Sequence, residues 1–238
     1  MQTYSSDFPI QKSTSKPWIL FNLESPSRFN ETKFKPVSHL FDWTLAFNRD
    51  SSIFVPYGVM IKKQIKVEDN FHWRLNIDGM KDVFAERTII KINEYSSRIK
   101  EKQVAWFVSN CRSASNREEY VKQLSKFIDV DIYGTCGKLK CGKKQYYDQC
   151  KEMAAMKYNF FLAFENSICA DYTSEKIIEA LKFGSLPVYF GGEISEQVIP
   201  RNAYINAMEF KSPKHLADYL LMVSKNETLY SSFFKWRS

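Results

Sequence analysis

The second half of the chain alternates apolar runs with amphipathic segments. The run at 104–108 is apolar throughout, which is typical of a strand buried on both faces of a parallel sheet. Similar runs and their spacing predict strands at 104–108, 130–133, 158–164 and 186–190, and helices from 116, over 145–156, over 174–183 and from 212. Strands that alternate with helices in this way predict an α/β fold with a doubly wound parallel sheet.

Start and stop signals bound several of these helices. Asn116 is placed to be the N-cap of the first helix, and Glu118 falls in its first turn. Gly184 follows the third helix, where a glycine commonly ends a helix. Ser212 and Pro213 open the last helix as N-cap and first helical residue. The apolar faces expected are Tyr120, Leu124, Phe127 and Ile128 for the first helix, and Leu216, Tyr219, Leu220 and Val223 for the last.

The first half is less regular. Residues 1–16 are polar and predict a loose terminus. A strand is predicted at Trp18–Leu23, and residues 41–58 predict two short apolar segments around a polar loop. A helix is expected near 80–97.

In a doubly wound sheet, ligands bind beyond the carboxyl ends of the strands. This rule directs attention to three loops, 109–117, 134–144 and 165–176.

Composition narrows the class of protein. Of 238 residues, 44% are hydrophobic and 26% charged, which excludes a disordered chain. No apolar run approaches the roughly 18 residues of a membrane span, and residues 1–7 show no signal peptide. The net charge of +7 suits a polyanionic ligand such as a nucleotide. Nucleic acid is not expected, because no concentrated basic stripe is present.

The five cysteines form no CxxC pair, and with three histidines they do not predict a structural zinc site. An odd count leaves one thiol free or paired outside this chain, and the pairing of the others stays open. Two sequons, at Asn30 and Asn226, are candidate N-glycosylation sites. Asp129 and Asp131 have the DxD spacing of some metal-dependent sugar-nucleotide enzymes, but nothing nearby completes a metal shell.

Loop 165–176 follows a buried strand and enters a helix. A helix N-terminus offers free N–H groups to a phosphate, and Lys176 adds a full positive charge there. Tyr172 is suited to stack on or hydrogen-bond a sugar or base, and Glu175 can accept hydrogen bonds from ribose hydroxyls. The alternative is an ordinary acidic first helical turn with Lys176 in solvent.

Arg117 opens a second helix of the same kind, after loop 109–117. A cation opposes the helix dipole unless an anion neutralises it, which favours Arg117 as a phosphate ligand. The alternative is an arginine that points into solvent.

Glu24 lies just past the apolar strand at Trp18–Leu23, so we expect partial burial, a raised pKa and the role of a general base. A surface carboxylate in a turn is the alternative.

The chain resembles the α-1,3-fucosyltransferases, from about Trp18 to Arg237. The stretches that carry the resemblance are FDWTLAFNRDSSIFVPYG at 41–58, FLAFENSICADYTSEK at 161–176, SLPVYFGG at 185–192, IPRNAYINAMEFKSPKHLADYL at 199–220 and FFKWR at 233–237. The resemblance implies a fold of the GT-B type, with two Rossmann-like domains. The first domain, residues 1–100, is expected to be incomplete and to face the acceptor, and residues 101–238 to bind the donor.

The resemblance also implies roles for single residues. Glu24 matches the proposed catalytic base, and Tyr172, Glu175 and Lys176 match the donor-binding motif D-Y-x-x-E-K. Arg117 matches an arginine that binds guanosine diphosphate. Asn110 and Asn166, in the same two loops, are expected to join the donor site.

The activity implied is inverting transfer of L-fucose from GDP-β-L-fucose to N-acetylglucosamine in protein glycosylation, on a glycoprotein or glycolipid acceptor. No metal or other cofactor is implied. The family also implies a Golgi membrane location, with a lumenal catalytic domain and a signal-anchor in the full-length form. The alternative is a catalytically inactive remnant that binds nucleotide sugars.

Overall fold

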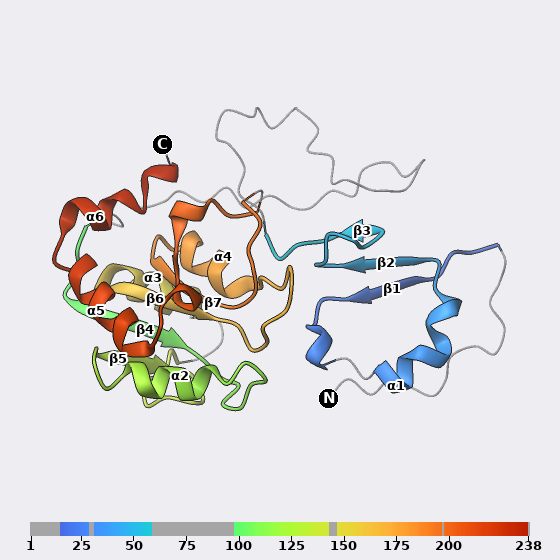
Figure 1. Ribbon diagram of the computed structural model, residues 1–238, viewed down its shortest axis with the longest axis horizontal. Helices are drawn as coiled ribbons and strands as arrows, with labels where there is room; N and C mark the ends of the chain where they lie inside the picture. Colours follow the sequence, from blue (N-terminus) through green and yellow to red (C-terminus); the bar gives the residue numbers. More distant parts are fainter. Residues whose placement is uncertain (1–14, 29–30, 59–97, 143–146, 197, 238) are drawn as a thin grey trace. The chain divides into compact units, whose positions relative to one another are not determined.

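The computed structural model describes residues 15–28, 31–58, 98–142, 147–196 and 198–237 (Figure 1). These residues form two compact units. The N-terminal unit contains residues 15–55 of the described part, and the C-terminal unit contains 56–58 and 98–237. The domain boundary expected at residues 100 and 101 stays a prediction. The helix expected near 80–97 lies outside the described residues.

The N-terminal unit is built on a parallel sheet with the order β1-β2-β3. Its strands are β1 (Ile19–Asn22), β2 (Trp43–Ala46) and β3 (Ile53–Phe54), and α1 (Glu31–Phe34) and short 3-10 helices lie between β1 and β2. The strands predicted at Trp18–Leu23 and within 41–58 are therefore confirmed. Asn48 forms the polar turn between β2 and β3, because its side chain accepts a hydrogen bond from Asp50 N at 2.7 Å.

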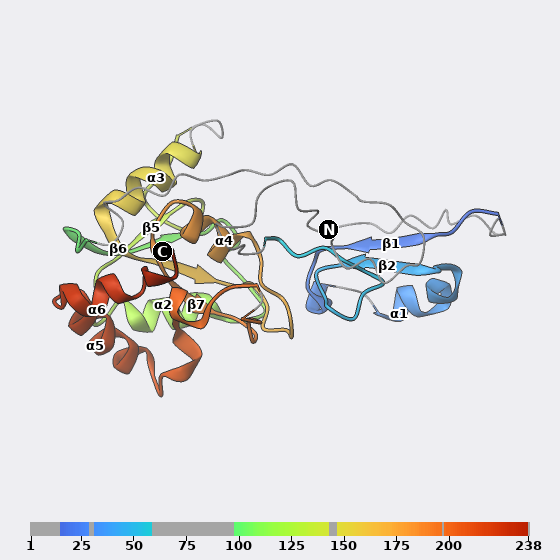
Figure 2. The same ribbon diagram turned by 90° about the horizontal axis from the view of Figure 1, so that it is seen from above.

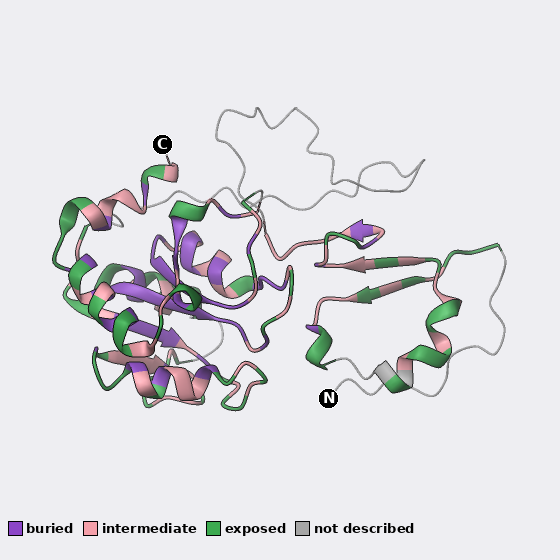
Figure 3. Ribbon diagram, in the orientation of Figure 1, coloured by how far each residue is buried: buried purple, intermediate pink, exposed green. Residues whose placement is uncertain are grey.

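The C-terminal unit holds a five-stranded parallel sheet with the order β5-β4-β6-β7-β8. The strands are β4 (Lys102–Phe107), β5 (Val130–Tyr133), β6 (Tyr158–Phe164), β7 (Leu186–Phe190) and β8 (Ile205–Asn206). Every residue of β6 and β7 is buried (Figure 3). Burial on both faces explains why these strands read as largely apolar runs rather than as alternating ones, with Asn159 of β6 as a buried polar exception.

Helices cover both faces of this sheet (Figure 2). One face packs against α2 (Arg117–Leu124), α5 (Pro213–Val223) and α6 (Glu227–Ser232) in one continuous apolar core. The other face packs against α3 (Tyr147–Lys157) and α4 (Glu175–Lys182) in two smaller clusters. The doubly wound arrangement predicted from the sequence is confirmed. Within the described part of the chain, no helix is both long and apolar enough to span a membrane.

The helix boundaries follow their signals, with two corrections in α2. Ser212 caps α5 by accepting a hydrogen bond from His215 N at 3.3 Å, and Gly184 follows α4 at a φ of +81°. Asn116 precedes α2 as expected, but it is left-handed at φ 54° and its side chain makes no cap bond. The apolar face predicted to reach Phe127 is also wrong: α2 ends at Leu124, and Phe127 is 43% exposed.

Four of the five cysteines pair within the chain. Cys111 bonds Cys136 and Cys141 bonds Cys150, while Cys169 is free. The first disulfide joins the loop after β4 to the loop after β5. It therefore ties together two of the three loops to which the sequence directed attention.

Candidate functional site

The chain changes direction across the sheet between β4 and β6. From β4 it passes outward to β5, and β6 then pairs with the opposite edge of β4. The loops after β4 and β6 therefore lead to helices on opposite faces of the sheet, and ligands bind at such a point in doubly wound sheets. The two loops contact each other near the sheet edge: Ser115 donates from its N–H to the Asn166 carbonyl at 3.0 Å and from its hydroxyl to the Glu165 carbonyl at 2.6 Å.

Arg117 stands between these loops. Its side chain is 4% exposed, so the solvent-directed alternative is wrong. The guanidinium donates to the Phe164 carbonyl, to the Asn110 carbonyl at 3.2 Å and to Glu118 at 3.3 Å. These bonds use three of its five N–H groups. Arg117 lies at the predicted place, and its role toward a phosphate stays a prediction.

Glu118 supplies negative charge at the start of α2. Its carboxylate accepts hydrogen bonds from the N–H of Ser113 at 3.3 Å and from its hydroxyl at 2.9 Å. Partial burial acts to raise the pKa of Glu118, but the backbone of α2, Ser113 and Arg117 outweigh it and hold that pKa below its ordinary value. Glu118 thereby neutralises Arg117 and complements the helix dipole.

The start of α4 is organised around a buried carboxylate, Glu165. Its side chain is fully buried and accepts hydrogen bonds from the N–H and the hydroxyl of Ser174, each at 2.8 Å. The Lys176 ammonium completes the set at 3.0 Å. Sequence reasoning missed Glu165. The signal that could have found it is an acidic residue directly after a seven-residue buried strand, which requires a cation or several donors nearby.

Lys176 lies at the start of α4 as predicted, but it is held rather than solvated. Its ammonium also donates to Ser174 Oγ at 2.7 Å and to Glu175 at 3.2 Å, and its side chain is 21% exposed. Partial burial acts to raise the pKa of Glu175, whereas the Lys176 charge and hydrogen bonds at the helix start lower it below its ordinary value. Glu175 is thus a half-exposed, charged acceptor beside the ammonium.

Tyr172 is buried, contrary to the exposed ring that stacking on a sugar or base would use. It is 3% exposed, and its ring meets that of Tyr57 edge-on at 6.4 Å. Its carbonyl accepts a hydrogen bond from Tyr189 Oη at 3.2 Å. In this arrangement Tyr172 anchors the loop that leads into α4, and its role toward a donor stays a prediction.

Two glycines after β7 make room for this loop. A Cβ on Gly191 would lie 2.3 Å from Tyr189 Oη and 3.0 Å from Glu165 Cγ. A Cβ on Gly192 would lie 2.0 Å from the Cys169 carbonyl oxygen. Too short for a dinucleotide fingerprint, Gly191-Gly192 instead allows close packing of the 165–174 loop against the end of β7.

The two asparagines expected in the donor site lie in these loops. Asn110 accepts from Arg117 through its carbonyl and from Arg112 N through Oδ1 at 3.4 Å. The Asn166 carbonyl accepts from Ser115, while its Oδ1 is buried without a hydrogen-bond partner among the described residues. Asn166 therefore holds an unused acceptor at the edge of the site.

Glu24 belongs to the N-terminal unit, whereas the other candidate residues of the donor site belong to the C-terminal unit. Its N–H donates to Asn22 Oδ1 at 2.9 Å, and its carboxylate lies 3.9 Å from Arg28. The side chain is 46% exposed, so the carboxylate is partly buried, as expected. The assignment of Glu24 as a base rests on the resemblance rather than on desolvation.

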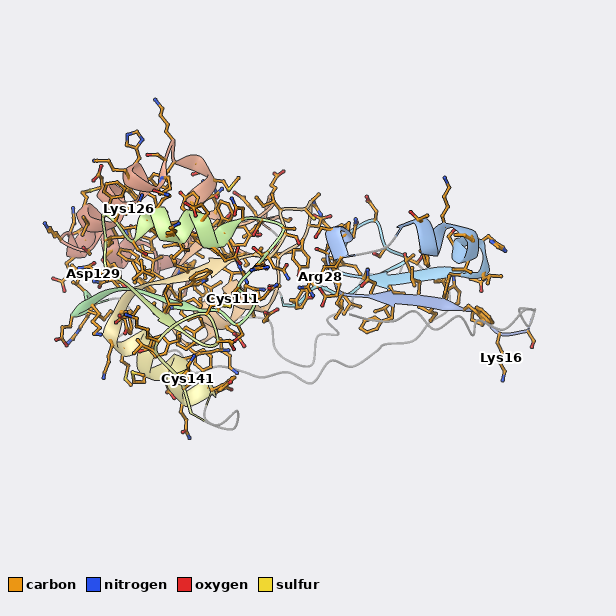
Figure 4. All side chains as sticks on the ribbon, turned by 90° about the horizontal axis from the view of Figure 1, so that it is seen from below. Lys16, Arg28, Cys111, Lys126, Asp129 and Cys141 are labelled. Carbon is orange, nitrogen blue, oxygen red and sulfur yellow. A yellow bond between two sulfur atoms is a disulfide. The ribbon has the colours of Figure 1, made fainter. Side chains whose placement is uncertain are left out.

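Asp129 and Asp131, which have the DxD spacing, do not form a metal site among the described residues. Asp129 lies just before β5 and Cys111 beyond the end of β4, at opposite ends of these parallel strands (Figure 4). Asp131 accepts from Lys102 and Tyr158, each at 2.6 Å. Across the described ranges, no three His, Cys, Asp or Glu side chains group as a metal site requires.

The two sequons differ in what the structure describes. Asn226 is exposed and caps α6, with Oδ1 accepting from Leu229 N at 3.0 Å. Asn30 lies outside the described residues.

Comparison with known proteins agrees with this geometry. The family model "Glycosyltransferase family 10 (fucosyltransferase) C-term" matches residues 97–238, and "Fucosyltransferase, N-terminal" matches residues 1–58. The chain is 39% identical over 222 residues to glycoprotein 3-alpha-L-fucosyltransferase A of Drosophila melanogaster, which covers 92% of this chain and 39% of the relative. It is 32% identical over 246 residues to GDP-fucose protein O-fucosyltransferase 3 of Xenopus laevis, with 98% and 49% covered.

A crystal structure of an α1,3-fucosyltransferase with GDP-fucose is similar in fold. The TM-score is 0.61 at 17% identity, over 94% of this chain and 67% of that one. The likeness confirms the expected α/β fold of the GT-B type. The chain spans about half the length, or less, of the two curated relatives named above.

Proposed function

Because the chain belongs to glycosyltransferase family 10, the fucosyltransferases, we propose that it transfers L-fucose from GDP-β-L-fucose to a hydroxyl of N-acetylglucosamine with inversion. The start of α4 carries this proposal. There a helix N-terminus and the Lys176 ammonium follow the carboxyl end of β6, at the point where the strand order of the sheet reverses. Such a place binds a diphosphate through free N–H groups and positive charge.

In the proposed reaction, the acceptor oxygen bonds to the anomeric carbon while the bond from that carbon to the phosphate oxygen breaks. Glu24 takes the hydroxyl proton, and GDP leaves. Lys176, Arg117 and the N–H groups of α4 stabilise the charge that develops on the diphosphate. Because these protein groups supply the positive charge, we propose that no metal is required.

The acceptor we propose is N-acetylglucosamine in glycoprotein glycans. One relative is named as a glycoprotein fucosyltransferase, which supports this choice, while another is named as a protein O-fucosyltransferase. Acceptor assays therefore need both glycans and unglycosylated protein.

We further propose a lumenal location on the Golgi membrane with an anchor in the full-length protein. Two disulfides and an exposed sequon at Asn226 suit that oxidising compartment.

A second candidate is a protein that binds nucleotide sugars without turnover. The carboxylate of Glu24 favours it, because the side chain is 46% exposed and lies 3.9 Å from Arg28, whereas a general base is more effective when it is more fully desolvated and has no neighbouring cation.

Transfer of labelled fucose from GDP-fucose, with GDP binding measured in parallel, tests both candidates. We expect Glu24→Gln to abolish transfer and spare GDP binding, and Lys176→Ala to weaken both. Excess chelator should leave transfer intact. Wild-type protein that binds GDP but transfers to no acceptor would favour the second candidate, and full activity in Glu24→Gln would overturn the assignment of the base. Complete loss with chelator would return attention to Asp129 and Asp131.

A further inference from the structure

We infer that Glu165 is a positioning residue of the donor site, which holds Lys176 and the start of α4 in the arrangement that receives the diphosphate. The inference rests on the proposed function. Its basis is the set of bonds that converge on one fully buried carboxylate: two from Ser174 and one from Lys176.

Because the Glu165 carboxylate is fully buried, it requires the ion pair with Lys176. A charge buried without compensation is strongly unfavourable, and Lys176 is the one cation that forms an ion pair with Glu165 within the described part of the chain. A lysine in the first turn of a helix would otherwise sample many rotamers in solvent. Glu165 removes that freedom before any ligand binds, and so reduces the entropy lost on binding.

The position of Glu165 is itself fixed from the sheet. Its N–H donates to the Phe190 carbonyl at 2.8 Å, which joins the end of β6 to the end of β7. Gly191 leaves the space that Glu165 Cγ occupies, since a Cβ there would come within 3.0 Å. The carboxylate is therefore carried by the rigid part of the fold and not by the flexible end of a loop.

The three partners of the Lys176 ammonium are not equivalent. Glu165 and Ser174 are fully buried, whereas the Glu175 side chain is 53% exposed and its bond is the longest of the three, at 3.2 Å. A phosphate oxygen can replace Glu175 at the lowest cost, because that carboxylate returns to water. Glu175 then becomes available to hydroxyl groups of the donor.

The test is a double-mutant cycle on GDP affinity, measured by titration calorimetry. Glu165→Gln keeps the shape and some acceptor capacity but removes the charge. We expect it to weaken GDP binding by about tenfold or more, as loss of a charged hydrogen bond does. In the Lys176→Ala background, the same change should weaken binding less than about threefold, because the residue acts through Lys176. KM for GDP-fucose should rise in parallel with Kd.

Glu179→Gln is the matched control. Glu179 lies on the same helix and pairs with Lys151 at 2.6 Å, but it makes no bond to Ser174 or Lys176. It should leave GDP affinity within about twofold of wild type, as expected for a partly exposed ion pair. If Glu165→Gln does not fold, Ser174→Ala enters the same cycle, with a smaller loss that is again absent without Lys176.

Several outcomes overturn the inference. These are an affinity loss that is equal with and without Lys176, a loss no larger than that of Glu179→Gln, or tighter GDP binding in Glu165→Gln. In each case, wild-type protein that binds GDP and transfers fucose leaves the proposed function standing. Wild-type protein that does neither overturns the proposed function and this inference with it.

Discussion

The guanidinium of Arg117 donates a hydrogen bond to the main-chain carbonyl of Phe164, joining the first residue of α2 to the last residue of β6. A second bond reaches the Asn110 carbonyl, in the loop after β4. One buried side chain thereby joins the loop after β4 to the end of β6, at the point where the strand order of the sheet reverses. Its geometry supports the site before it contacts any ligand.

Arg117→Lys should therefore damage stability and binding together. A lysine keeps the charge but cannot serve two carbonyls in fixed fork geometry, so at least one buried acceptor loses its donor. We expect a loss of about 1–3 kcal/mol in the free energy of unfolding, and weaker GDP binding. Urea unfolding and GDP titration measure the two effects. Wild-type stability in Arg117→Lys would mean that the carbonyl bonds contribute little.

The Cys111–Cys136 disulfide should matter more for binding than the Cys141–Cys150 disulfide. The first closes a separation of 25 residues and the second a separation of 9. Loss of the first should lower the free energy of unfolding by about 3 kcal/mol, and loss of the second by somewhat less. Only the first lies next to Asn110, whose carbonyl accepts from Arg117. The paired serine variants, compared by thermal unfolding and GDP titration, provide the matched control. Equal loss of GDP affinity in both variants would contradict the prediction.

Gly191→Ala should disrupt the site through simple overlap. The added methyl group would lie 2.3 Å from Tyr189 Oη, and Tyr189 is buried and bonded to the Tyr172 carbonyl, so it cannot easily move. We expect a loss of about 1–3 kcal/mol in stability, typical of overpacking, together with weaker GDP binding. Gly142→Ala is the control, because nothing lies within 4 Å of its added Cβ, although its φ of +74° adds some strain. Identical behaviour of the two variants would remove the packing argument.

Stability should fall in acid through Glu118 and Glu175. Their pKa values in the folded protein lie below the ordinary 4.5, so the folded state binds protons less readily than the unfolded chain. The stabilisation is complete at pH values well above 4.5 and is lost as the pH falls through the lowered values. Urea midpoints at pH 7 and at about pH 3 should differ less in Glu118→Gln and Glu175→Gln than in wild type. An unchanged difference in both variants would refute this origin.

The strands and the sheet arrangement could be predicted from the sequence because a strand buried on both faces has a recognisable local pattern of apolar residues. Fully buried β7 and residues 160–164 of β6 appear as apolar runs, and Gly184 marks the end of α4. Phe127 shows the limit of periodicity. It continues the apolar spacing of α2, but the Ser125 hydroxyl bonds back to the Val121 carbonyl as the helix ends, and the ring is left on the surface.

The candidate site could be predicted from the sequence only in part. Lys176 and Arg117 could be located because a loop between a strand and a helix has a sequence signature. Their partners could not, because Glu165, Phe164 and Asn110 meet them through the tertiary fold. The sequence offered solvent or ligand as alternatives for each cation, and the structure shows a third arrangement in which each is held by the protein itself.

The parallel pairing of β4 with β6 has a consequence for how the C-terminal unit folds. Lys102 pairs with Tyr158 across 56 positions, so the centre of the sheet forms only after a long loop closes. The Cys111–Cys136 bond, which spans 25 of those positions, shortens the flexible path between the two strands. Refolding from urea should therefore be faster for the oxidised chain than for the reduced one, so the bond that joins the loops after β4 and β5 also accelerates assembly of the sheet that carries them.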